Sequence, residues 1–180
     1  MQDNKKYIAL FRGINVGGKN KVEMKRLKKL FELIGFENVA SYINSGNIKF
    51  ESNEKIDIVW KDIIKNFTNE FSFDVPILVK TQIEIIKIAD KIPFEWQNNT
   101  EQKTDVAYLF PDIDSADTIE QLPVDRAFID VRYTPGAIYW NIDRKNQNKS
   151  KLNKLVGHKL YQFMTVRNVN TARYLATWND

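Results

Sequence analysis

The sequence predicts an α+β protein in which a ferredoxin-like βαββαβ N-terminal lobe packs with a second, topologically similar α+β lobe. Two patterns predict this class. Strand-length apolar runs and amphipathic segments alternate in the order βαββαβ over about the first 80 residues. The second half then repeats strand, helix, strand, strand and helix without a residue-level repeat. A chain of 180 residues suits two small joined lobes, and we assign residues 1–81 and 82–180 to them.

Apolar spacing and turn residues define the elements of the first lobe. Residues 7–11 form a short apolar run without helical period, which indicates a buried strand. Leu27 and Phe31 recur at helical spacing, and Gly35 ends that helix. Residues 44–47 have the composition of a hairpin turn. We expect strands at residues 7–11, 39–43, 48–50 and 75–80, and helices at 22–34 and 54–71. The apolar stripe of the second helix is Ile56, Trp60, Ile63, Phe67 and Phe71.

Turn residues and prolines divide the second lobe into shorter elements. Pro93 and Pro123 each end a helix, and residues 133–136 (YTPG) join two strands as a hairpin. Ser150 is expected to cap a further helix. We expect strands at residues 105–110, 127–131 and 137–142, and helices at 82–91, 115–122, 151–156 and from 170 or 171 to 178.

Composition excludes several classes of site. The chain has no cysteine, so disulfides, thiol nucleophiles and cysteine metal clusters are excluded. His158 is the single histidine, which excludes a histidine metal triad. The acidic residues 112–117 lack the spacing of a calcium loop. We therefore expect no metal and no cofactor. The N-terminal segment has no signal-peptide h-region and no run of membrane length, so we expect a cytoplasmic protein without a membrane partner.

Three stretches carry a resemblance to a known family: ALFRGINVGG at residues 9–18, YINSGNIKF at 42–50 and TVRNVNT at 165–171. In this order and at this spacing they resemble the bacterial domain-of-unknown-function 1697 family over nearly the whole chain. The third stretch departs from the family pattern, which often has an aromatic residue where Val169 stands. The resemblance implies an α+β fold of two subdomains and a cytosolic location. It implies no activity, because the family has no established biochemical function.

Charge is distributed unevenly, although the net charge is only +4. Residues 144–178 contain eight Lys or Arg and no acid, and residues 19–29 contain six bases and one acid. Residues 95–130 contain nine acids and two bases. Such asymmetry indicates an anionic partner. The alternative is that the acidic and basic segments face each other or the solvent.

The loop after the first strand is a candidate anion site. Its sequence GINVGGKN lacks the Ser or Thr that a P-loop requires, because Asn20 stands there. A glycine-rich loop before a helix still exposes backbone N–H groups to an anion, and Gly17 and Gly18 permit close approach. Arg12 would add a bidentate cation and Asn15 a neutral donor. The alternative is a tight turn in which the glycines adopt positive φ and Arg12 pairs with a local carboxylate.

Three further segments supply candidate ligand-binding residues. They are Ser45 and Asn47 in the turn at 44–47, Lys149, Ser150 and Lys151 before a helix, and Arg167, Asn168 and Thr171 before the last helix. Lysines at a helix N-terminus oppose the helix dipole unless an anion is present. An arginine with polar groups at a positive helix end suits an anion. The alternatives are an ordinary hairpin turn, an exposed loop and simple helix capping.

These residues lead to three hypotheses. The first is a binding module whose two lobes form a basic cleft, lined by Arg12, Lys149, Lys151 and Arg167, for a phosphorylated small molecule or a nucleic-acid backbone. The second is an enzyme that acts on a phosphorylated small molecule by positioning and charge stabilisation. The third is a structural or interaction protein. RNA-recognition modules use the same sheet, but their signature of alternating strand aromatics is absent. The sequence leaves catalysis and oligomeric state open.

Overall fold

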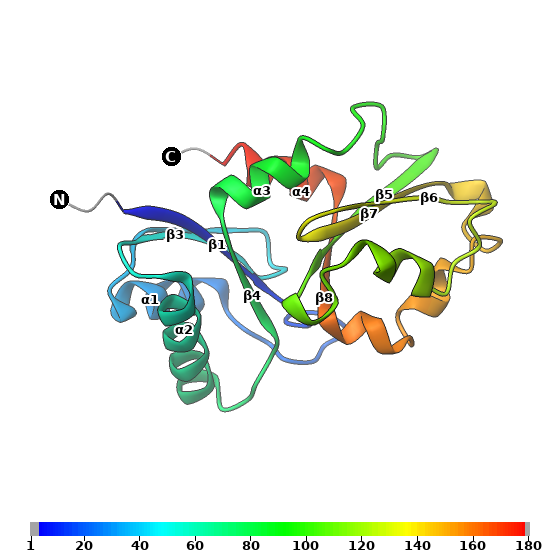
Figure 1. Ribbon diagram of the computed structural model, residues 1–180. Helices are drawn as coiled ribbons and strands as arrows, with labels where there is room; N and C mark the ends of the chain where they lie inside the picture. Colours follow the sequence, from blue (N-terminus) through cyan, green and yellow to red (C-terminus); the bar gives the residue numbers. More distant parts are fainter. Residues whose placement is uncertain (1–3, 179–180) are drawn as a thin grey trace. The chain divides into compact units, whose positions relative to one another are not determined.

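The computed structural model describes residues 4–178, and the chain divides into two compact units, Met1–Gln82 and Ile83–Asp180. Each unit contains a four-stranded antiparallel sheet with helices (Figure 1). The predicted α+β class with two similar lobes is therefore confirmed.

The first unit has the ferredoxin-like order predicted from the sequence. Its elements are β1 (Lys5–Phe11), α1 (Met24–Ile34), β2 (Glu37–Tyr42), β3 (Asn47–Ser52), α2 (Ile56–Phe71) and β4 (Ile77–Thr81). The strand order is β2-β3-β1-β4, and β1 is antiparallel to both of its neighbours. Leu10 pairs with Asn47 and Phe11 with Ile77. The loop after β1 therefore leaves the sheet beside the first residues of β3 and β4.

One face of the first sheet packs against α1 and α2. Tyr7, Ala9 and Phe11 alternate along β1, are at most 1% exposed and belong to the core of this unit. The ring of Phe11 lies 6.2 Å from that of Phe31 on α1 and 5.3 Å from that of Phe67 on α2, between centroids. The strand period of two and the helix period of 3.6 bring these rings to facing surfaces. The strand aromatics are thus core residues.

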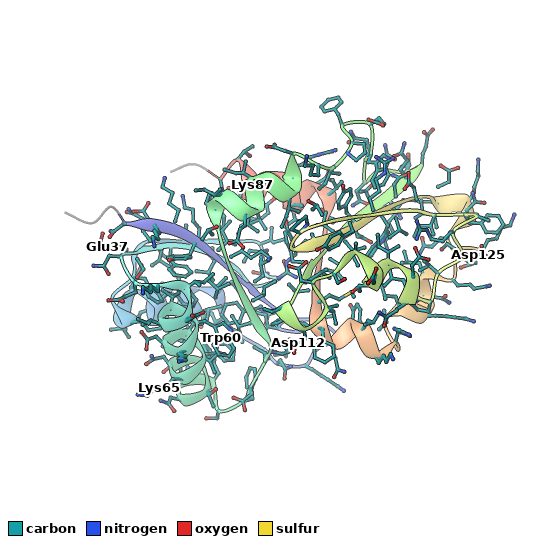
Figure 2. All side chains as sticks on the ribbon, in the orientation of Figure 1. Glu37, Trp60, Lys65, Lys87, Asp112 and Asp125 are labelled. Atoms are coloured by element: carbon teal, nitrogen blue, oxygen red, sulfur yellow. The ribbon has the colours of Figure 1, made fainter. Side chains whose placement is uncertain are left out.

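Trp60 departs from the predicted apolar stripe of α2. It is 42% exposed, while Val59 beside it is fully buried. Its indole Nε1 donates a hydrogen bond to Ile77 O at 2.9 Å, so the ring lies beside β4, an edge strand of the sheet (Figure 2). An indole of this kind combines apolar contact with a satisfied polar end.

The second unit repeats the strand order of the first with shorter helices. Its regular elements are α3 (Gln82–Ala89), which starts at the unit boundary, β5 (Gln102–Leu109), β6 (Asp130–Thr134), β7 (Ala137–Asp143), β8 (Met164–Asn168) and α4 (Val169–Ala176). Its 3-10 helices are η1 (Pro111–Ile113), η2 (Ala116–Gln121), η3 (Arg144–Asn146), η4 (Leu152–Leu155) and η5 (Lys159–Phe163). The order β6-β7-β5-β8 matches β2-β3-β1-β4 strand for strand. The 3-10 helices take the places in the chain that α1 and α2 have in the first unit.

Several expectations for the second lobe need correction. The expected helices at 115–122 and 151–156 are the 3-10 helices η2 and η4, which suit segments too short for stable α-helix. Lys151, with φ +58°, precedes η4 in place of the expected cap Ser150. The hairpin across residues 133–136 forms, but β6 begins at Asp130 and not at residue 127. β8 was not predicted.

Candidate functional site

The loop after β1 folds into a short hairpin with its two glycines at the tip. Lys19 N donates to Val16 O at 3.2 Å. Gly17 and Gly18 between them have φ of +60° and +76° and are exposed. Positive φ at both central residues is what a type I′ turn requires. The tight-turn interpretation therefore accounts for both glycines.

Asn15 joins this hairpin to two neighbouring segments. Its φ of +55° lies in the left-handed region, which asparagine tolerates better than most residues. Its Nδ2 donates to Val22 O at 2.8 Å and to Asn44 O at 3.0 Å, and its Oδ1 accepts from Val22 N at 2.8 Å. The amide that was predicted to donate to a ligand thus uses both of its protons within the protein.

The turn at residues 44–47 packs directly against this loop. Phe11 N donates to Gly46 O at 2.8 Å. A Cβ built on Gly46 would lie 2.6 Å from Phe11 Cβ and 2.7 Å from Ile14 Cδ1. Asn47 is fully buried, and its Nδ2 donates to Ser45 Oγ at 3.0 Å. We call residues 13–22 and 44–47 the loop corner, because these contacts hold the two segments together at one end of the sheet.

Arg12 lies at the start of the loop corner. Its backbone N donates to Pro76 O at 3.0 Å, which fixes the chain beside β4, and its side chain is half-buried. The contribution of this guanidinium to ligand binding stays a prediction, as does that of Ser45.

Helix α1 begins beside the loop corner with an open N-terminus. Glu23 occupies the N-cap position without a side-chain cap, and the first helical hydrogen bond runs from Leu27 N to Glu23 O at 2.9 Å. The N–H groups of the first three helical residues therefore have no helical acceptor. This turn carries Lys25 and Arg26 and no acid, although the helix dipole disfavours cations at this end.

A hollow of about 690 Å³ adjoins this helix end. It is lined by Asn15, Gly18, Lys21, Val22, Glu23, Met24, Arg26, Asn44 and Phe71. Arg26 already pairs with Glu70, and its guanidinium carbon lies 5.1 Å from the centroid of the Phe71 ring. Among the described residues no carboxylate pairs with Lys21. Lys21 is therefore the cation of this lining that remains available to a ligand.

In the second unit, the predicted residues 149–151 lie against the segment at 125–128. Lys151 Nζ is 3.5 Å from Asp125 Oδ2, and Lys149 Nζ is 5.6 Å from the centroid of the Phe128 ring. Ser150 is fully buried; its Oγ donates to Gln147 O at 2.7 Å and accepts from Leu152 N at 3.2 Å. The Ser150 hydroxyl thus serves the local turn, and the ligand roles of the two lysines stay predictions.

The other predicted residues of the second unit lie where β8 meets α4. Asn168 caps α4, because its Oδ1 accepts from Thr171 N at 2.9 Å. Arg167 on β8 is 8% exposed, and its Nη1 donates to Thr165 Oγ1 at 2.9 Å. Burial lowers the pKa of Arg167 to about 10, an effect that the hydroxyl of Tyr108 opposes. Capping accounts for Asn168 and Thr171, while a ligand role for Arg167 stays a prediction.

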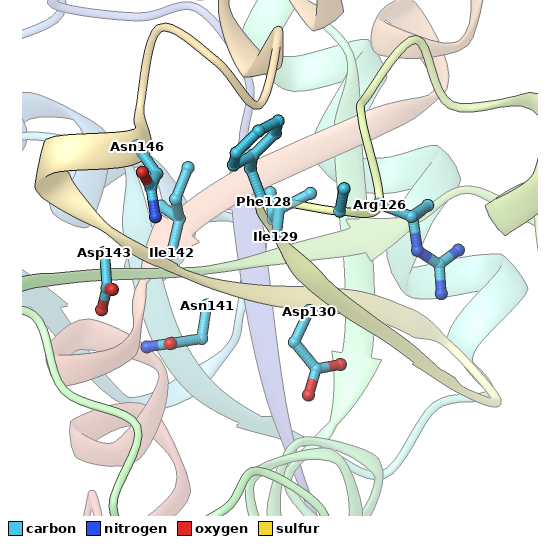
Figure 3. A pocket seen from close by; sticks show the side chains of 9 residues that line it. Arg126, Phe128, Ile129, Asp130, Asn141, Ile142, Asp143 and Asn146 are labelled. Atoms are coloured by element: carbon cyan, nitrogen blue, oxygen red, sulfur yellow. The ribbon is translucent and has the colours of Figure 1, made fainter.

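A second hollow, of about 480 Å³, lies along the β6–β7 hairpin (Figure 3). Asp130 and Asn141 are register partners, and their side chains lie on the same side of the hairpin. Asn141 Nδ2 donates to Gln102 Oε1 and Thr104 Oγ1 at 2.9 and 2.8 Å, and Asp130 pairs with Arg132 at 2.8 Å. The amide protons of Asn141 and the carboxylate of Asp130 therefore already have partners within this unit.

Sequence reasoning selected the loop that adjoins the hollow of the first unit, but it did not select two groups of residues that line the hollows. Lys21 and the open end of α1 were not selected, although the six bases at residues 19–29 were the available signal. Asp105 and Trp140, which line a cavity of the second unit, gave no signal until the strand register was known. Within residues 4–178, no three His, Asp or Glu side chains are grouped as metal ligands. The described helices include none with the length and apolar character to cross a bilayer.

Comparisons with known proteins agree with this architecture. A family model described as a protein of unknown function, DUF1697, matches residues 4–139. Among solved structures, a conserved bacterial protein from Streptococcus pneumoniae superposes with a TM-score of 0.84 at 25% sequence identity, covering 97% of this chain and 98% of that chain. No curated protein matches the sequence.

Proposed function

We propose that this chain, which belongs to the DUF1697 family of proteins of unknown function, binds a phosphorylated small molecule in the hollow at the start of α1. The observation that carries the proposal is the open N-terminus of α1 with Lys25 and Arg26 on its first turn. Helix N-termini bind phosphate through their N–H groups and the helix dipole. An anion seated there would relieve the unfavourable position of Lys25, whereas Arg26 already pairs with Glu70.

The loop corner supports the proposal by holding the approach to α1 in a fixed shape. Asn15 ties the hairpin to Val22 and Asn44 through three hydrogen bonds. Gly18 and Lys21 line the hollow from this hairpin. A site that is ordered before binding loses less conformational entropy when the ligand arrives. The Lys21 ammonium group would then pair with the bound phosphate.

Glu23 provides a sharp test of the proposal, because it is an acidic residue in the lining of a proposed anion site. Its carboxylate repels a phosphate, whereas Lys21 attracts it, and both line the same hollow. Neutralising the two residues should therefore move the affinity in opposite directions. Lys21→Met should weaken binding roughly fivefold and Glu23→Gln should strengthen it roughly two- to fivefold, as expected for partly exposed charges.

The experiment is a titration of the full ¹⁵N-labelled chain with inorganic pyrophosphate, observed by amide NMR shifts. Saturable shifts should concentrate at residues 18–26. Lys61→Met serves as the matched control, because this exposed lysine of α2 lies ten residues before Phe71, about 15 Å along the helix. Equal effects of Lys21→Met and Lys61→Met, or shifts spread over both units, would reject the site.

A nucleic-acid backbone is the competing ligand, and salt distinguishes the two. Binding of a mixed-sequence single-stranded oligonucleotide should fall steeply with salt if several phosphates are contacted. A small phosphorylated ligand held at one helix end should show a shallow dependence. A steep slope, with oligonucleotide preferred over pyrophosphate, would replace the small-molecule proposal with a nucleic-acid one.

Two predicted arginines carry planar bidentate donors and are tested separately. Arg12 adjoins the loop corner and is a further candidate contact for the ligand of this hollow, whereas Arg167 belongs to the other unit and is proposed as an anion contact of that unit alone. Substituting each by alanine and repeating the pyrophosphate titration tests them one at a time. Unchanged affinity for either variant removes that arginine from the ligand's contacts.

A further inference from the structure

The second unit contains a small cavity between its sheet and the 3-10 helix η4. Its volume is about 160 Å³. The lining comprises Lys103 and Asp105 of β5, Trp140 of β7, Val166 of β8, and Gln147, Leu152, Asn153, Leu155, Val156 and Tyr161 from the covering segment. Cavities of about this size with apolar walls admit a benzene-sized molecule. The space therefore suits one small ring.

The polar wall of this cavity contains an unsatisfied donor. Trp140 is 3% exposed, and its indole Nε1 has no hydrogen-bond partner among residues 4–178. Buried indole N–H groups usually have an acceptor, because leaving one unpaired is unfavourable. Leu152 and Leu155 belong to the surrounding core and offer no polar group. The polar groups of the lining make no hydrogen bond to this N–H either, so a molecule in the cavity can supply its acceptor.

Asp105 supplies an acceptor next to this donor. It is the cross-strand partner of Trp140, so both side chains stand on the same face of the sheet. Asp105 is 8% exposed and lies 3.5 Å from the Lys103 ammonium, between Oδ2 and Nζ. Burial raises the pKa of Asp105, and the charge of the neighbouring Lys103 opposes that rise. A hydrogen bond from a ligand would further stabilise this carboxylate.

We infer that this cavity binds a small ring compound that carries a hydroxyl group. A hydroxyl both accepts and donates, so one group can accept from the Trp140 N–H and donate to the Asp105 carboxylate. The ring then occupies the space against Leu152, Leu155 and Val166. An amine satisfies the carboxylate alone and a carboxylate ligand is repelled by Asp105, so the hydroxyl fits this pair best.

The covering segment gives the cavity an entrance. Asn153 and Val156 line the cavity and are exposed, whereas Leu152 and Leu155, each next to one of them in the chain, are buried. η4 is a single 3-10 turn, which has weaker hydrogen bonds than an α-helix. A small ligand can therefore enter past the exposed edge of η4 without disturbing the sheet.

The test is a titration of the ¹⁵N-labelled full chain with phenol at low millimolar concentration, observed at the indole Nε1–H resonance of Trp140. Trp140→Phe assigns that resonance. Saturable movement is expected on phenol addition, whereas the indole of Trp60, already bonded to Ile77 O, should not move. Toluene has a methyl group in place of the hydroxyl and should bind at least about fivefold more weakly.

Two variants separate recognition by the cavity from other effects. Asp105→Asn should weaken phenol binding severalfold with little change of shape, and Val166→Phe should fill the cavity and abolish binding. If Val166→Phe does not fold, loss of phenol affinity in Trp140→Phe, measured by calorimetry, takes its place. An indole resonance that phenol leaves in place, equal affinity for phenol and toluene, or binding that survives both variants would overturn the inference.

Discussion

Replacing Gly46 with alanine should destabilise the first unit far more than replacing Gly18, although the two glycines have nearly the same positive φ. The two glycines have φ of +75° and +76°, where an L-residue costs about 1–2 kcal/mol. The entropy that alanine removes from the unfolded chain is the same at both positions. The matched pair therefore isolates what the new methyl group meets.

The surroundings of the two positions differ completely. A Cβ at position 46 would lie 2.6 Å from Phe11 Cβ and 2.7 Å from Ile14 Cδ1, whereas a Cβ at position 18 would have no atom of the described residues within 4 Å beyond its chain neighbours. Overpacking of a filled region costs about 1–3 kcal/mol. The free energy of unfolding should therefore fall by about 2–5 kcal/mol for Gly46→Ala and by about 1–2 kcal/mol for Gly18→Ala.

Urea unfolding followed by NMR at the amides of β1 and β3 measures this difference residue by residue. This readout is preferable to a global signal, because a chain of two units need not unfold in a single step. Equal losses for the two variants would refute the close packing of the turn against the loop, and with it the rigid loop corner.

Three further predictions concern single side chains. Asn15→Ala should lower the free energy of unfolding of the first unit by about 1–3 kcal/mol, because three hydrogen bonds are lost. Hydrogen exchange at the Val22 amide should become faster in this variant, and an unchanged exchange rate would contradict the prediction. Tyr108→Phe should leave stability unchanged or raise it by about 1 kcal/mol, because the buried hydroxyl has no hydrogen-bond partner in the described part of the chain. A clear loss of stability measured by calorimetry would contradict this. Asp105 has a pKa raised by burial, so the folded state binds its proton more tightly and this group's contribution to stability falls as pH rises above its ordinary value of 3.8. The stability of Asp105→Asn relative to the unaltered chain should therefore improve between pH 3 and pH 7, and a difference independent of pH would exclude the raised pKa.

Much of the first unit could be predicted from the sequence, because its elements are long and strongly periodic. Phe31 of α1 and Phe67 of α2 each belong to an apolar series with the helical period, and both rings pack against Phe11 of β1. The hairpin at 44–47 was visible from its turn residues. The exposed Trp60 was not, since an apolar stripe does not reveal that a neighbouring carbonyl will satisfy an indole at the edge.

The second unit was harder to predict because its connections are short 3-10 turns without a clear period. β8 carries Arg167 and Asn168 in only five residues, so it looks like a polar loop. It becomes a strand through pairing with β5, about 60 residues earlier in the chain. Such non-local pairing leaves no local pattern.

The candidate site residues likewise divide into those with a local sequence pattern and those that depend on strand pairing. Gly17, Gly18 and Asn15 were selected for a ligand, yet turn geometry and internal hydrogen bonds account for them. Their effect is to shape the corner beside α1. The pairing of Asp105 with Trp140 depends on strand register, because a shift by one residue would place them on opposite faces.

The affinity of the full chain for inorganic pyrophosphate, measured calorimetrically in parallel for the unaltered chain, Lys21→Met and Glu23→Gln, tests the proposed function most directly. An anion held at the start of α1 predicts weaker binding in the first variant and tighter binding in the second. Affinities that stay the same in both variants, or that move together in one direction, would contradict a phosphate site in this hollow.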